Sequence, residues 1–135
     1  MSKSIQEVEG IGPKYAELLK QQGITTTDKL LAAGGDRAGR KAIAEKTSIS
    51  DSNILKWVNM CDLFRIKGVA GQFAELLEGA GVDTVKELRN RNADNLAEKM
   101  AEVNEQKHLC KTSPSAKVVN GWVEQAKTLT PMVSH

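Results

Sequence analysis

The sequence predicts an all-α protein built from two pseudo-repeats of about 60 residues, with about eight helices packed on one core. Residues 8–31 align with residues 66–89 without a gap, and eight of the 24 positions are identical. Apolar residues elsewhere recur at helical spacing, and no stretch alternates in the manner of a strand. The predicted repeats are residues 1–65 and 66–135, expected to form one compact unit because neither half buries much surface alone.

The first copy carries start and stop signals for two short helices. Pro13 suits a first helical turn, apolar residues recur over 15–19, and Gly23 stands where a left-handed C-terminal cap belongs. Residues 25–28 have the composition of a helix start, before the apolar pair at 30–31. We therefore expect two helices separated by a tight turn.

The second copy repeats these signals, and longer helices follow in both copies. Thr84 and Glu87 have the spacing of a capping box before a short helix that carries Leu88. Trp57 and Trp122 hold matching places, and we expect both to anchor the core. Apolar positions at helical spacing mark the longer helices: Ile43; Ile54, Val58 and Cys61; Leu96, Met100 and Val103; and Val119, Trp122, Val123 and Ala126.

The similarity between the copies resumes at a different offset near their ends. Residues 50–58 correspond to residues 115–123, so about seven residues are inserted in the second copy. Residues 111–114 read as a loop that ends in Pro114, and proline disfavours a helical conformation in the residue before it. We expect the insertion in the connection over 109–114.

Composition excludes several classes of protein. A chain of 135 residues with 40% apolar residues fits an ordinary globular domain, and a net charge of +2 is far from that of a strongly basic nucleic-acid binder. Cys61 and Cys110 form no CxxC pair, and we expect both to be reduced and buried. The sequence has neither a signal peptide nor a membrane span, which predicts a cytoplasmic protein without membrane contact.

The segment from Val8 to Leu19 resembles the helix-hairpin-helix motif, with an apolar residue, Gly10, Ile11 and Gly12 before a helix. Glycines at these places allow positive φ and leave no Cβ in the way of a phosphate. The helix N-terminus that follows favours an anion, and Lys14 adds a charge-assisted contact. Ile11 would pack inward and fix the turn. In nucleic-acid enzymes and repair proteins the motif holds the sugar-phosphate backbone without reading sequence, and the resemblance implies that activity here.

The second copy departs from the motif. Ala70 replaces the second glycine and Gln72 replaces Lys14, while in the first copy Glu9 places an anion beside the hairpin. We expect the second hairpin to be structural. The alternative for both hairpins is a connector that packs two helices.

A second group of cations lies in the first copy. Arg37, Arg40 and Lys41 follow a flexible glycine pair and are candidate phosphate contacts together with Lys14. The alternative is a solvated helix face.

Nothing in the sequence predicts catalysis or a cofactor. His108 and His135 lack the spacing of a metal site, the acidic residues are scattered, and no nucleotide-binding loop or nucleophile elbow is present. We expect no enzyme activity, no cofactor and no bound metal.

At the scale of the whole chain, the sequence resembles an uncharacterised bacterial family, a domain of unknown function built from tandem helix-hairpin-helix units. The segments that carry the resemblance are residues 9–14, 39–41, 44–47, 55–60 and 62–69. The resemblance implies the fold and brings no activity with it.

The sequence supports two hypotheses about function. The first is a non-catalytic helix-hairpin-helix module that binds DNA or RNA backbone without sequence specificity, using Gly10, Ile11, Gly12, Lys14 and the cations Arg37, Arg40 and Lys41. The alternative is a protein-protein interaction or scaffold module in which both hairpins are purely structural. The sequence predicts neither the oligomeric state nor the pathway.

Overall fold

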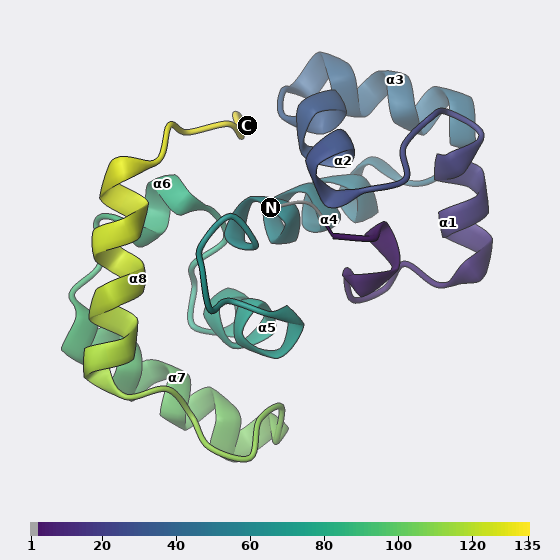
Figure 1. Cartoon of the computed structure of the whole chain (residues 1–135). Coiled ribbons are helices and arrows are strands. Elements are labelled where there is room, and N and C mark those ends of the chain that lie inside the picture. The colour runs from purple at the N-terminus through teal and green to yellow at the C-terminus, as the bar shows by residue number, and fades with distance from the viewer. Residues whose placement is uncertain (1–2) are drawn as a thin grey trace. The chain divides into compact units, whose positions relative to one another are not determined.

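A computed structural model describes residues 3–135, and within that range the chain is all-helical, without a β-strand (Figure 1). The prediction of an all-α fold with about eight helices is confirmed. One short 3-10 helix and eight α-helices follow in order: η1 (Ile5–Glu7), α1 (Pro13–Lys20), α2 (Thr27–Gly34), α3 (Arg37–Thr47), α4 (Asp51–Leu63), α5 (Gly71–Gly79), α6 (Val85–Leu88), α7 (Ala93–Lys107) and α8 (Ala116–Thr128). A single isolated bridge pairs Ser4 with Thr26.

The chain divides into two compact units. Unit 1 contains the described residues up to Asp62 together with Met132–His135, and unit 2 contains Leu63–Pro131. The division therefore falls within the last turn of α4, and the final four residues belong to unit 1.

In unit 1, the hairpin before α1 packs against a buried tryptophan, Trp57. Gly10 has a φ of +95°, and a Cβ placed there would lie 3.0 Å from the Trp57 Nε1. Tyr15 packs on the same indole, with ring centroids 5.1 Å apart and a tilt of 57° between the planes. Glycine is thus required at position 10 both by the backbone conformation and by the closeness of the indole.

Unit 2 contains the same arrangement. Gly68 has a φ of +92°, and a Cβ there would lie 3.3 Å from the Trp122 Nε1. Phe73 packs on Trp122 with ring centroids 5.3 Å apart. Trp57 and Trp122 are both buried, as predicted.

The insertion in the second copy is shared between a helix and a loop. At the offset of 58, α3 (37–47) corresponds to residues 95–105, and α7 continues two residues beyond this range at its C-terminal end, so two of the about seven extra residues lengthen the helix and the others lie in the loop. The loop after α7 is longer than the loop after α3, and the Asn104 side chain holds it through two hydrogen bonds to the main chain of Cys110, of 2.8 and 3.0 Å. The insertion therefore lies mostly in the predicted connection and extends beyond it, because two of its residues belong to the end of α7, which continues to Lys107.

The two cysteines differ in their surroundings. Cys61 is buried in α4, and burial, followed by the charges of Asp28 and Asp62, raises the pKa of its thiol to about 12. Cys110 is only half-buried, because it lies in the loop after α7 and not on a helix. Both thiols are free.

None of the helices within residues 3–135 has the length and apolar character needed to cross a membrane.

Candidate functional site

The first hairpin is a tight turn over Val8–Gly12 with its apolar residue turned inward. The Ile11 amide donates to the Val8 carbonyl at 3.1 Å, and the Ile11 side chain is 4% exposed, so it packs inward as predicted. Gly10 and Gly12 are both exposed. The glycines therefore face outward while the isoleucine fixes the turn.

The N-terminus of α1 is open. Gly12 is its N-cap, in extended conformation with φ −81° and ψ −177°, and no side chain caps the helix. A Cβ at Gly12 would meet nothing within 4 Å, and Pro13 and Lys14 are exposed. Because the first N–H groups of a helix have no acceptor within the helix, those of Lys14 and Tyr15 remain available to an external acceptor.

Within residues 3–135, only the two helices that follow hairpins start without a side-chain cap. At every other α-helix a side-chain oxygen just before the helix accepts a hydrogen bond from a first-turn N–H, and these cap residues are Thr26, Asp36, Ser50, Thr84, Asn92 and Ser115. The N-caps of α1 and α5 are Gly12 and Ala70, which have no such oxygen. Missing caps are thus confined to the hairpins.

The second hairpin is tied to α8. The Gln125 side chain accepts from the Lys67 amide at 2.9 Å and donates to the Lys67 carbonyl at 3.3 Å. Gln72 is exposed at the place equivalent to Lys14, so this hairpin has no cation in the first turn of its helix. The first hairpin has no equivalent of this amide link, because the residue in the place of Gln125 is the buried Met60.

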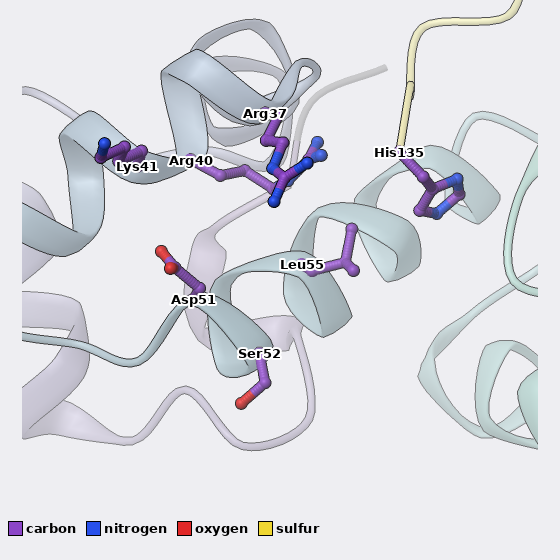
Figure 2. A pocket seen from close by; sticks show the side chains of 7 residues that line it. All are labelled: Arg37, Arg40, Lys41, Asp51, Ser52, Leu55 and His135. Atoms are coloured by element: carbon purple, nitrogen blue, oxygen red, sulfur yellow. The ribbon is translucent and has the colours of Figure 1, made fainter.

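The cations of α3 line a separate cavity of about 620 Å³ (Figure 2), here called the α3–α4 cavity. Arg37, Arg40 and Lys41 project from the first turns of α3, and Asp51 and Leu55 point toward them from α4 (Figure 2). Its lining residues are Arg37, Arg40, Lys41, Asp51, Ser52, Leu55 and His135. Gly39 brings α3 close to α2, since a Cβ there would collide with the Ala33 carbonyl oxygen.

Arg40 has a structural role that the sequence did not reveal. Its side chain is 6% exposed, and one guanidinium nitrogen donates to the carbonyls of Gly34 and Gly35 at 2.9 and 3.1 Å. The other donates to the Ser134 carbonyl at 2.6 Å, and the Ser134 amide donates to Gly35 at 2.8 Å. Arg40 thus joins the C-terminal end of α2 to the last residues of the chain, and its hydrogen-bonding capacity is largely used within the protein.

The structure does not bring all the predicted site residues together. Gly10, Gly12 and Lys14 lie exposed in one turn around the buried Ile11, at the end of α1 away from α3 (Figure 1), and Lys14 is not among the residues of the α3–α4 cavity. Sequence reasoning assigned no role to the remaining cavity residues, Asp51, Ser52, Leu55 and His135. The only sequence signal in this region is the correspondence of residues 50–58 with residues 115–123, which indicates a repeat and not a site.

Among the described residues, no group of three or more His, Cys, Asp or Glu side chains is placed to hold a metal ion.

Three comparisons with known proteins bear on the chain. The family described as "Domain of unknown function (DUF4332)" matches residues 9–129. A stretch of 57 residues is 32% identical to part of Halomucin from Haloquadratum walsbyi, which covers 42% of this chain and 1% of that protein. The chain thus spans about one hundredth of the curated relative it matches. No solved structure matches.

Proposed function

The chain belongs to the DUF4332 family, whose function is unknown, and we propose from its geometry that it is a non-catalytic module that binds nucleic-acid backbone through the first hairpin. The observation that carries the proposal is the open N-terminus of α1, which is exposed at Gly12 and flanked by the exposed Lys14. A phosphate oxygen placed there would supply the acceptor that a side-chain cap supplies at most other helices of the chain.

The chemistry of the turn suits a phosphodiester. With no Cβ at Gly12, a phosphate reaches the first-turn N–H groups directly, and the helix dipole favours its negative charge. The Lys14 ammonium adds a charge-assisted hydrogen bond to the same group. Glu9 is exposed on the same turn and repels phosphate, so we expect weak binding.

The burial of the aromatic rings favours contact with the nucleic-acid backbone over stacking on bases. Trp57 and Trp122 are 2% and 3% exposed, and Tyr15 and Phe73 pack on them. The two indoles are thus engaged in the core, and Tyr15 and Phe73 are half-buried with one face packed on them, which leaves little aromatic surface for a base. We therefore expect binding to DNA or RNA without sequence preference.

Fluorescence anisotropy with labelled single-stranded and duplex DNA, at low and high salt, tests the proposal. We expect salt-sensitive binding that is lost in Lys14→Glu and retained in Gln72→Glu, which makes a similar change to an acid at the equivalent place in the second hairpin. Unchanged anisotropy at low salt up to about 100 µM protein, a range that covers typical non-specific affinities, would refute it. The helical-adaptor hypothesis would then remain, to be tested by light scattering and pull-down.

A further inference from the structure

The first turns of α3 carry three cations against two nearby carboxylates, those of the N-cap Asp36 and of Asp51 across the cavity. Arg37 and Lys41 are separated by four residues and share one helix face, and the first turn of α3 contains no acidic residue. Like charges at this spacing repel, and cations near a helix N-terminus oppose the helix dipole. Neither side chain forms an ion pair with a described residue. A bound anion would relieve both unfavourable interactions.

The α3–α4 cavity has the size and walls of a small-molecule site. Its volume of about 620 Å³ lies within the range usual for ligand pockets. The cations of α3 form one wall, and Asp51 and Leu55 of α4 face them, whereas the Ser52 hydroxyl points away from α3 (Figure 2). The cavity therefore offers anion contacts on one side and hydrogen-bond acceptors with an apolar surface on the other.

Arg40 acts here as a positioning residue. Its three hydrogen bonds to main-chain carbonyls hold Ser134 against Gly35, which places His135 in the wall of the cavity. Arg37 and Lys41 are exposed and remain available to a ligand.

We propose that the α3–α4 cavity binds a phosphomonoester attached to a group that donates hydrogen bonds, as in a nucleoside monophosphate or the 5′-phosphate end of a strand. Arg37 and Lys41 contact the phosphate, whose negative charge complements both. Asp51 accepts hydrogen bonds from the hydroxyl or amino groups of the nucleoside, and Leu55 packs on its apolar surface. The Asp51 carboxylate disfavours a bare polyanion and so selects a ligand with both an anionic and a donating end.

This site is separate from the first hairpin, and the two proposals can fail independently. Lys14→Glu leaves every residue of the cavity in place, and changes at Arg37 and Lys41 leave the hairpin in place.

Titration of the ¹⁵N-labelled full chain with AMP, followed by amide chemical shifts, tests the proposal. We expect saturable shifts confined to residues 36–41, 50–55 and 134–135. Each lost charge-assisted contact weakens binding roughly tenfold, so Arg37→Gln with Lys41→Gln weakens it about 100-fold. Lys46→Gln is the matched control, because Lys46 lies on the same helix outside the cavity and its loss leaves AMP binding unchanged.

Three results would overturn the proposal: no saturable shifts up to about 10 mM AMP, equal binding of adenosine and AMP, or undiminished binding by the double variant. A 5′-phosphorylated trinucleotide and its unphosphorylated form identify the source of the phosphomonoester. Tighter binding of the phosphorylated strand than of AMP supports a strand end, and the reverse order supports a free nucleotide.

Discussion

An aspartate introduced at the N-cap of α1 or α5, the two helices that follow hairpins, should distinguish effects on protein stability from effects on nucleic-acid binding. The extended backbones of Gly12 and Ala70, with ψ of −177° and −179°, fall in the same region as that of Asp36, which caps α3 by accepting from the Gly39 amide at 2.7 Å. The variants Gly12→Asp and Ala70→Asp therefore place a carboxylate where a capping bond to a first-turn N–H can form.

The expected magnitudes differ because glycine is already a tolerable cap and alanine is a poor one. Ala70→Asp should stabilise the protein by about 1 kcal/mol from the cap, with a further few tenths from the helix dipole. Gly12→Asp should gain only a few tenths of a kcal/mol, and it meets no steric obstacle because a Cβ at Gly12 has nothing within 4 Å. Thermal unfolding followed by circular dichroism should show a rise in Tm of roughly 2–6 °C for Ala70→Asp and a smaller one for Gly12→Asp.

For nucleic-acid binding we expect the larger effect in Gly12→Asp and none in Ala70→Asp. In Gly12→Asp, the new carboxylate occupies the N–H groups of α1 and repels phosphate, so binding should be lost although the fold is at least as stable as before. Ala70→Asp should bind as the parent chain does. Full binding by Gly12→Asp would refute a role for the open helix start, and a lowered Tm in both variants would refute the capping geometry.

Three further predictions concern the first hairpin and the two cysteines. Gly10→Val should lower stability by about 1–3 kcal/mol, because φ at this position is +95° and a Cβ would lie 3.0 Å from the buried indole; an unchanged Tm would contradict the hairpin geometry. Under native conditions at pH 8, a thiol reagent should modify the half-buried Cys110 and spare Cys61. Since the folded pKa of Cys61 is raised to about 12, its contribution to stability is full below the unfolded pKa and is lost as pH rises from about 9 toward 12. In Cys61→Ala the loss of stability that the Cys61 thiol causes at alkaline pH should be absent when Tm is measured against pH. An equal loss in the variant would contradict the raised pKa of Cys61.

Local signals in the sequence were sufficient for most of the fold. The start of α1 at Pro13, the positive φ of Gly23 and the cap that Thr84 provides to Glu87 depend on residues within one or two turns of each other. The buried faces of the longer helices follow from apolar periodicity in the same way, and Leu96 and Val119 are examples. Such features are set by backbone preferences and hydrogen bonds over short separations.

The candidate sites were only partly predictable because tertiary contacts assemble them. The first hairpin is contiguous, so its residues could be named in advance. The role of Arg40 depends on Ser134, which is 94 residues away, and no local pattern indicates that partner. The α3–α4 cavity combines two helices with the end of the chain, and periodicity predicts the faces of helices but not which faces meet.

The hydrogen bond from Arg40 to the Ser134 carbonyl also bears on when unit 1 becomes complete during synthesis. Most of unit 1 is translated before unit 2, but the carbonyl that completes the surroundings of its buried guanidinium is translated after unit 2. Domains usually fold as units in the order in which they are made. Here part of unit 1 is made only after unit 2, so a nascent chain or a fragment that stops at Asp62 would carry a buried cation without one of its three main-chain acceptors.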